Sequence, residues 1–339
     1  MVMHSATSQN ATDPSGDDPQ SASQVAIDSI VSDIARRYFD LGWDFGSFSG
    51  INLPDGAPSE MKQGWEQARQ RLTQRAPTRF ERKWLSLRGN ALRRNRVVDP
   101  AVTPSYIEEI KTGHCPVLGT PLTCATGGDM DWSIDRVYND GAYAPSNLCV
   151  MSAKANKAKG CKMLGDVLVM ADEARRSGQA AGGLTEREWR RMAAVMVGPH
   201  VLVTNEIHLL PQATFIPRDL AITTEQLLQQ AVMFDALGEA SGKVIGRLRA
   251  HCHAKAERLL HKLVQALRRK DGRSPWIYDV WLEAGVFDRF REWYTSLSGY
   301  DQRLVCDLAQ KIEYKKTLTL AKHEIGGWAL PTGGYAVRP

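Results

Sequence analysis

Residues 114–162 read HCPVLGTPLTCATGGDMDWSIDRVYNDGAYAPSNLCVMSAKANKAKGCK, and no other segment of the chain carries so specific a pattern. Aromatic and β-branched residues over Trp132–Tyr138 predict a short strand, and the apolar run Leu148–Met151 predicts a returning strand. Between them, Asn139-Asp140-Gly141 supplies residues that tolerate positive φ, which favours a chain reversal. This part of the segment therefore predicts two strands joined by a long loop.

A short helix is expected directly after the second strand. Ser152 can cap the N-terminus of a helix over Ala153–Lys159, and Gly160 can end that helix in a left-handed conformation. Asn156 and Lys159 lie three residues apart, so they share roughly one face of this helix. The whole segment therefore predicts the order strand, loop, strand and short helix.

Three polar residues lie on these predicted elements, and two of them could form a metal site. Asp135 lies inside the first strand, where an acid is unusual and needs a partner. Asn147 opens the second strand, and Asn156 lies one turn into the helix. One carboxylate and one amide oxygen, completed by waters and a substrate phosphate, are a suitable ligand set for Mg²⁺. Such hard oxygen ligands beside a lysine suit phosphodiester chemistry better than they suit zinc.

The segment resembles the ββα-metal core of the HNH endonuclease family, in the branch with the pattern S-I/L-D-R-I/V-x-N-x-x-G-Y-x-P-x-N…N-x-x-K. The matching residues are Ser133-Ile134-Asp135-Arg136-Val137, Gly141, Tyr143, Asn147-Leu148 and Asn156-Lys157-Ala158-Lys159-Gly160. The resemblance covers about residues 114–162 only. It implies that Asp135 and Asn156 hold the metal, that Asn147 ties the loop between the strands, and that Lys159 is the basic residue after the second ligand. The implied cofactor is Mg²⁺, with Mn²⁺ as the alternative.

Arg136 departs from the many family members that place a histidine, the general base, directly after the aspartate. An arginine cannot deprotonate water because its pKa lies far above neutrality. It could instead clamp the scissile phosphate. The base is therefore unassigned: His114 and Tyr138 are the nearest candidates, and metal-bound hydroxide or a substrate phosphate oxygen are alternatives. The expected catalytic residues are Asp135, Arg136, Asn147, Asn156, Lys159 and His114.

Two basic segments are expected to grip the DNA backbone. The chain carries a net charge of +5, but two of its segments are rich in basic residues and have a higher local charge. Residues 79–96 hold seven basic side chains against one acid, interleaved with aromatic residues, directly before the nuclease-like segment. Residues 242–270 read as the longest helix, with an apolar stripe and a basic surface. The expected nucleic-acid contacts are Arg79, Arg82, Lys83, Arg88, Arg93, Arg94, Arg96, Arg247, Lys255, Arg258 and Lys262.

The remaining chain predicts helices on both sides of this segment, hence an α+β, mainly α-helical fold with a small ββα-metal (HNH) core embedded between helical regions. The predicted organisation is a disordered tail over 1–24, a basic helical region over 25–103, the nuclease core over 104–163 and a helical region over 164–339. No family resemblance extends over residues 164–339. The role of that region is left open between DNA target binding, homodimerisation and recruitment of a partner protein.

The helices expected outside the core are Gln24–Phe45, two between Glu60 and Arg96, Thr103–Lys111, Leu164–Arg176, Thr185–Val197, Thr223–Leu237, Trp276–Leu297 and Gln302–Leu318. Loops are expected over 42–58 and 199–217. The six cysteines form no C-x-x-C pair, so their spacing argues against a structural zinc site. No apolar run of about 18 residues and no signal peptide is seen, which predicts a cytoplasmic protein without a membrane partner.

The function expected from these observations is metal-dependent endonucleolytic cleavage of DNA, double-stranded by preference. Taken singly, Asp135 and Arg136 would read as a structural ion pair and the asparagines as ordinary turn residues. The alternative is therefore a DNA-binding or partner-binding protein whose core is catalytically degenerate, and Arg136 keeps that alternative open. A third reading is an RNA nuclease, because the metal site does not distinguish the sugar.

Overall fold

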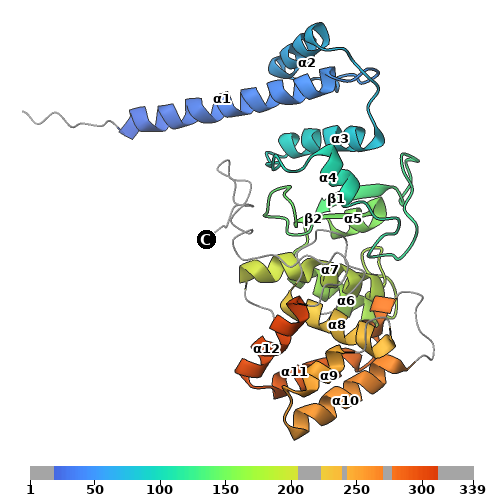
Figure 1. The fold of residues 1–339 in the computed structure, drawn as a ribbon. Coiled ribbons are helices and arrows are strands. Elements are labelled where there is room, and N and C mark those ends of the chain that lie inside the picture. Colours follow the sequence, from blue (N-terminus) through green and yellow to red (C-terminus); the bar gives the residue numbers. More distant parts are fainter. Residues whose placement is uncertain (1–18, 205–222, 239–242, 270–276, 312–339) are drawn as a thin grey trace, which may run out of the picture. The chain divides into compact units, whose positions relative to one another are not determined.

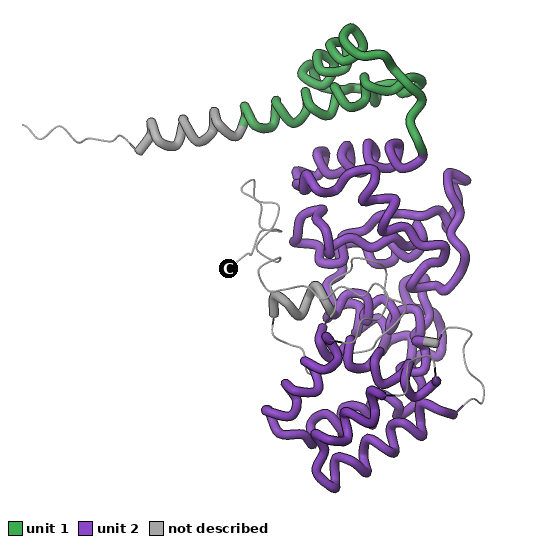
Figure 2. The backbone as a smooth tube through the Cα atoms, in the orientation of Figure 1, with its two compact units in different colours: residues 1–78 green, residues 79–339 purple. Residues whose placement is uncertain are grey.

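The computed structural model describes residues 19–204, 223–238, 243–269 and 277–311. The chain divides into two compact units, residues 1–78 and 79–339 (Figure 2). The described residues are mainly helical and contain one small two-stranded antiparallel sheet, consistent with the expected α+β class (Figure 1). The predicted basic region, 25–103, spans both units, because its residues from Arg79 onward belong to the second unit and pack with the sheet.

The first unit is built from two helices, α1 (Pro19–Gly46) and α2 (Ser59–Arg71), which pack closely on each other. Residues 1–18 of the predicted tail lie outside the described residues, and Pro19 to Gln24 are helical. The predicted loop beginning at Gly42 starts after Gly46 instead. A close helix crossing explains the two glycines. A Cβ on Gly42 would lie 1.9 Å from the Met61 carbonyl oxygen, and one on Gly64 would lie 2.0 Å from that of Phe39.

Substitution of Gly64 by alanine is expected to destabilise the first unit. Its methyl group would overlap backbone atoms of α1, so the helices must separate, and overpacking of this kind costs about 1–3 kcal/mol. Faster amide exchange in α1 and α2, with exchange in residues 79–311 unchanged, is the expected result. Gly89→Ala in the helix Arg79–Arg93 is the control, because its Cβ would meet open space. Equal exchange rates in the Gly64→Ala and wild-type proteins would contradict the crossing.

The second unit contains the sheet and the remaining helices. Its elements, in chain order, are α3 (Arg79–Arg93), α4 (Pro104–Glu109), β1 (Trp132–Arg136), β2 (Leu148–Ser152), α5 (Ala153–Lys159), α6 (Leu164–Ser177), α7 (Glu186–Thr204), α8 (Thr224–Leu237), α9 (Val244–Arg249), α10 (Ala254–Arg268), the 3₁₀ helix η2 (Ile277–Leu282), α11 (Val286–Ser296) and α12 (Gly299–Gln310). The predicted order strand, loop, strand, short helix is confirmed over β1, β2 and α5.

The two faces of the sheet pack against different helices. Strands β1 and β2 pair antiparallel, with Asp135 opposite Cys149. Leu148 and Val150 point to one face and form a cluster with residues of α3 and α4. Cys149 and Met151 point to the other face, where residues of α5, α6 and α7 cover them. Residues of α8 to α12 form a separate hydrophobic cluster.

Two predicted helix caps are confirmed. Ser152 Oγ accepts a hydrogen bond from Ala155 N at 3.1 Å, and Thr103 Oγ1 accepts one from Tyr106 N at 3.2 Å. Gly160 follows α5 with φ 53° and ψ −125°, so its φ is positive but it is not in the predicted left-handed helical conformation. In the loop between the strands, positive φ falls on Ser146 (φ 67°) and on none of residues 139–141. The chain does turn at the predicted place, since Gly141 N donates to Tyr138 O at 3.1 Å, but it does so without positive φ at residues 139–141.

The helix predicted over residues 242–270 is two helices, α9 and α10. The chain leaves the helical path between them, and the His253 side chain accepts a hydrogen bond from Ala256 N and caps α10. The longest described helix is α1. Similarly, η2 and α11 replace the single helix predicted over 276–297, because Gly285 adopts φ 72° between them; Trp276 lies outside the described residues.

Two further boundaries differ from the predictions. Helix α7 continues through Pro199 to Thr204, where irregular chain was expected, and residues 205–217 of that predicted loop lie outside the described residues. Helix α12 spans Gly299–Gln310, and residues 312–318 of the predicted helix also lie outside them. Within the described ranges, none of the helices is both long enough and apolar enough to cross a bilayer.

Candidate functional site

Asn147 ties the loop between β1 and β2. Its side chain is fully buried, and Oδ1 accepts a hydrogen bond from Tyr138 N at 2.9 Å. Its Nδ2 donates to Tyr138 O at 3.1 Å and to Ala142 O at 2.9 Å. This side chain takes over pairing from the backbone, which explains why β1 ends at Arg136 and not at Tyr138. Gly141 is required here, because a Cβ would lie 2.6 Å from Asn147 Nδ2.

Asp135 forms a largely buried ion pair with Lys159. Asp135 Oδ2 lies 2.9 Å from Lys159 Nζ, and the side chains keep 13% and 0% of their surface exposed. Burial raises the pKa of the Asp135 carboxyl, and the neighbouring Lys159 ammonium opposes that shift. Apart from this ion pair, Oδ2 has no partner among the described residues, so it retains lone-pair capacity for another ligand.

Lys159 is bound on three sides by protein atoms. Besides Asp135, its ammonium donates to Arg136 O at 2.9 Å and to Asn139 Oδ1 at 2.8 Å. An ammonium has three protons, so these partners use its full donor capacity. Lys159 is one of the expected catalytic residues, but a buried and satisfied ammonium has no proton left for a substrate phosphate. Lys159 instead joins α5, β1 and the loop.

Arg136 is also held inside the fold. Its guanidinium donates to Asn139 O and, at 2.9 Å, to Gly141 O, and it lies over the Tyr143 ring at 4.9 Å from the centroid. Only 9% of the residue is exposed. The expected clamp on the scissile phosphate is therefore not formed by this arrangement. Arg136 stabilises the loop and supports Tyr143.

Asn156 reaches β1 from α5. Its Nδ2 donates to Ser133 Oγ at 2.7 Å. Ser133 and Asp135 are two residues apart in a strand, so their side chains share one face of the sheet. Asp135 and Asn156 thus lie on the same face of β1. One carboxylate with spare lone-pair capacity and one amide oxygen fit a magnesium ion in donor type, although Lys159 already neutralises the carboxylate.

A polar cleft lies between α3 and this part of the sheet. It has a volume of about 180 Å³ and is lined by Lys83, Ser86, Leu87, Asn90, Arg94, Ser133, Ile134, Tyr143 and Asn156. No carboxylate is among these lining residues. Two cations, three hydroxyls and two amides therefore line one cavity, an arrangement that suits the oxygens of a phosphodiester. Asp135 and His114 do not line it.

The expected DNA contacts on α3 and directly after it are only partly exposed. Arg79, Arg82, Arg93 and Arg94 are exposed, whereas Lys83, Arg88 and Arg96 are half-buried. Arg88 lies over the Trp84 ring at 4.7 Å from the centroid. Burial lowers the pKa of the Lys83 ammonium, which donates to Trp132 O at 2.6 Å. Lys83 and Arg94 line the polar cleft, and Arg79 lines a second cavity described below.

The second expected basic segment belongs to another part of the unit. Helices α8 to α12 lie together in the second unit (Figure 1). The apolar residues of α9 and α10 are buried in the cluster that they form with α8, α11 and α12. On their outer surface the expected contacts are all exposed: Arg247, Lys255, Arg258 and Lys262. None of these residues lines the polar cleft. The structure therefore does not bring the two predicted DNA-binding segments together at one site.

The two candidates for the general base differ in exposure. His114 is exposed in the chain before β1, and Tyr138 is 8% exposed behind the loop. In the described part of the chain, no three His, Cys, Asp or Glu side chains cluster to hold a metal ion. The candidate metal site contains only one side chain of these four types, Asp135, because Asn156 is an amide. The absence of a three-residue cluster therefore does not test this site.

Sequence reasoning missed two features of this unit. One is the cavity lined by Arg79, Lys111 and Trp132, whose residues are distant in sequence. The other is a buried ion pair between Arg191 and Asp279. No local pattern marks either feature.

No protein-family model matches this chain, and comparisons with curated proteins and with solved structures likewise give no match.

Proposed function

We propose that this protein is a metal-dependent endonuclease of the HNH type that hydrolyses phosphodiester bonds in DNA. The observation that carries the proposal is the placement of Asp135 and Asn156 on one face of β1 beside a cationic polar cleft. The frame of β1, β2 and α5 and the Asn147 tie agree with the pattern of the HNH resemblance. DNA, double-stranded by preference, is the proposed partner.

The chain's own side chains divide the work. Lys83, Asn90 and Arg94 would bind phosphate oxygens in the polar cleft and balance their charge. Asp135 and Asn156 would hold the divalent metal, Mg²⁺ first and Mn²⁺ as the alternative. A bound metal of this kind polarises a phosphoryl oxygen and lowers the pKa of bound water. Asn147, Arg136 and Lys159 keep β1, the loop and α5 in register, so they position these groups.

One observation favours a second candidate, a DNA-binding protein with a non-catalytic core. Lys159 already supplies the positive charge that the Asp135 carboxylate needs, so the site is electrically balanced without a metal. The basic cleft serves binding equally well in that case. An RNA nuclease is the third candidate, because nothing in the cleft identifies the sugar.

Supercoiled plasmid is expected to be nicked or linearised by the purified protein with Mg²⁺ or Mn²⁺ and left intact with chelator. The metal requirement follows from the oxygen donors of Asp135 and Asn156. Asn156→Ala is expected to reduce the rate, whereas Arg291→Ala, which removes an exposed charge from α11, is the matched control. Salt-dependent duplex binding without cleavage under any metal would replace the proposal by the second candidate, and preferential cleavage of RNA by the third.

A further inference from the structure

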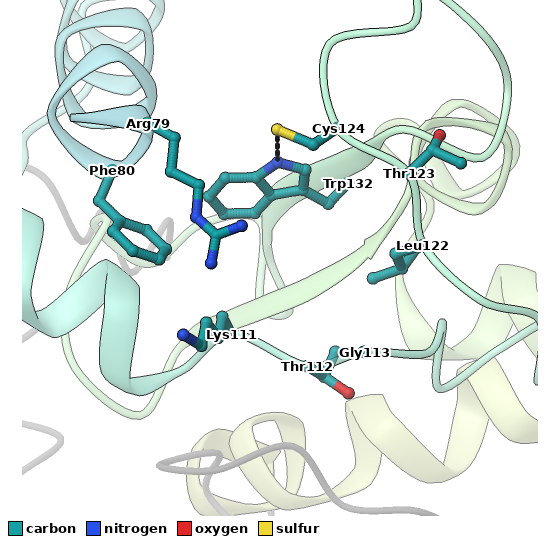
Figure 3. A pocket seen from close by; sticks show the side chains of 9 residues that line it. All are labelled: Arg79, Phe80, Lys111, Thr112, Gly113, Leu122, Thr123, Cys124 and Trp132. Atoms are coloured by element: carbon teal, nitrogen blue, oxygen red, sulfur yellow. Dashed lines mark hydrogen bonds between the residues drawn. The ribbon is translucent and has the colours of Figure 1, made fainter. Parts of the chain in front are cut away.

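A second cavity lies beside the polar cleft, and we call it the aromatic pocket. It measures about 310 Å³ and is lined by Arg79, Phe80, Lys111, Thr112, Gly113, Leu122, Thr123, Cys124 and Trp132 (Figure 3). This volume is at the lower end of the roughly 300–1,000 Å³ usual for small-molecule sites. Its lining combines two aromatic rings with two cations and no acid.

The Trp132 indole is held in a defined orientation. Its Nε1 donates to Cys124 Sγ at 3.2 Å, and the Phe80 ring meets it edge-to-face with centroids 6.2 Å apart (Figure 3). Lys83 Nζ lies 4.8 Å from the Trp132 ring centroid and belongs to the wall of the polar cleft. A fixed indole beside an open cavity is a stacking surface for a planar, electron-poor ring.

The two cations of the pocket are anchored on Phe80. The Arg79 guanidinium lies 4.7 Å and the Lys111 ammonium 5.2 Å from the Phe80 centroid. Both residues are exposed; the Lys111 ammonium also lies 3.5 Å from Glu108 Oε1 in an exposed ion pair, and Glu108 is not part of the pocket lining, which contains no acid. An aromatic surface with flanking cations is complementary to a nucleobase and its phosphate.

The loop that closes the pocket is organised by Asp131. Its carboxylate accepts hydrogen bonds from Thr123 Oγ1 at 2.7 Å and from Gly127 N at 2.8 Å. Hydrogen bonds from Thr123 and then Thr126 lower the pKa of this carboxyl to about 2, so it stays ionised at neutral pH. The wall formed by Thr123 and Cys124 is therefore held in place without any ligand.

The pocket and the cleft follow one another along the same two elements. Arg79 and Phe80 of α3 line the pocket, and Lys83 lines the cleft one helical turn, about 5.4 Å, further on. On β1, Trp132 lines the pocket, and Ser133 and Ile134 line the cleft. A nucleic-acid strand lying along α3 and β1 would meet the pocket and the cleft with successive units.

We propose that the aromatic pocket binds an unpaired nucleotide, with its base on Trp132 and its phosphate between Arg79 and Lys111. This deepens the proposed nuclease function and rests on it for the neighbouring phosphate: the substrate is DNA in which a single-stranded or extrahelical nucleotide adjoins the bond bound in the polar cleft.

Alkylation of native protein in chelator tests the pocket without cleavage. Cys124 and Cys161 are both exposed, and only Cys124 lines the pocket. A single-stranded oligodeoxynucleotide is expected to slow iodoacetamide labelling of Cys124 and leave Cys161 labelling unchanged, as read by mass spectrometry. The same oligonucleotide with abasic sites is expected to protect weakly. Equal protection by both oligonucleotides would show that phosphate alone binds there and would overturn the proposal, as would equal protection of both cysteines.

Affinity measurements with variants complete the test. Trp132→Leu is expected to weaken binding of the single-stranded oligonucleotide by about tenfold or more. Arg291→Ala, an exposed charge outside the pocket, is the control for general electrostatics, and Arg79→Ala should exceed it. If Trp132→Leu misfolds, the cysteine protection of the native protein decides. Protection of Cys124 without any cleavage would contradict the proposed nuclease activity and support nucleotide binding in the pocket. Cleavage of duplex DNA without protection of Cys124 would support the nuclease activity and contradict nucleotide binding in the pocket.

Discussion

Asp135→Asn is expected to lower the rate of DNA cleavage by a factor of roughly 10³ or more, because the metal that the carboxylate would hold supplies several kcal/mol of transition-state stabilisation. Binding of DNA in chelator is expected to change little, since Asp135 does not line the polar cleft. Plasmid cleavage and filter binding measure the two effects separately. Cleavage at the wild-type rate by a folded Asp135→Asn protein would remove Asp135 from the site and with it the proposed metal.

Stability must be separated from activity in this test. Asparagine at position 135 leaves the buried Lys159 ammonium with Arg136 O and Asn139 Oδ1 but without a counter-charge. Removal of one partner of a buried pair is strongly destabilising, whereas replacement of both is often nearly neutral. The double variant Asp135→Asn/Lys159→Met is therefore expected to be more stable than Asp135→Asn alone and no more active. Recovery of cleavage together with stability would mean that Asp135 acts only through the fold.

Lys159→Met alone separates the two roles proposed for the lysine. The sequence resemblance implied a catalytic position, and the structure places the ammonium against three protein oxygens. Retained cleavage in a folded Lys159→Met protein is the result expected of a positioning residue. Loss of cleavage at unchanged stability would return Lys159 to the catalytic set.

Local patterns were sufficient for the frame of the candidate site. The strands at Trp132 and Leu148 and the caps at Ser152 and Thr103 depend on residues within a few positions of one another, which is the range that sequence patterns report. The break between α9 and α10 left no such signal. The apolar stripe continues across it, and the cap is His253, which is not a usual capping residue.

The environment of the basic residues could not be read in the same way. The sequence around Lys159 is the same whether its side chain contacts a phosphate or a buried carboxylate, so the pattern cannot distinguish the two. The three oxygens around the ammonium, from Asp135, Arg136 and Asn139, come together only in the folded chain and show that Lys159 is satisfied internally. The aromatic pocket likewise brings together Arg79, Lys111 and Trp132. These residues are far apart in the sequence, and the spacing of apolar residues within one helix or strand does not report how separate elements pack.

Removal of one partner from the buried ion pair of Arg191 and Asp279 is expected to destabilise the second unit strongly. Arg191 Nε donates to Asp279 Oδ1 at 2.9 Å and Nη2 to Oδ2 at 2.6 Å, and the side chains keep 8% and 2% of their surface exposed. Arg191 Nη1 also donates to Val117 O at 3.0 Å. One guanidinium on α7 thus joins η2 to the segment that precedes β1.

Asp279→Ala is expected to lower the free energy of unfolding of this unit by about 3–5 kcal/mol, because it leaves the Arg191 guanidinium buried without a counter-charge. Arg187, whose Nη1 lies 3.4 Å from Asp279 Oδ2, loses its partner as well, but its side chain is 49% exposed and contributes less. Urea unfolding measures the loss. Asp172→Ala, which removes the exposed partner of Arg175, is the control and is expected to cost about 0–1 kcal/mol.

The double variant Asp279→Leu/Arg191→Met distinguishes the charge from the packing. It removes both charges and keeps apolar volume, so it is expected to recover most of the stability lost in Asp279→Ala. If Asp279→Ala unfolds at the same urea concentration as Asp172→Ala, the pair does not stabilise the unit. If the double variant is as unstable as the single one, loss of the hydrogen bond from Arg191 to Val117 O costs as much as the unpaired charge, and the ion pair is not the source of the stability.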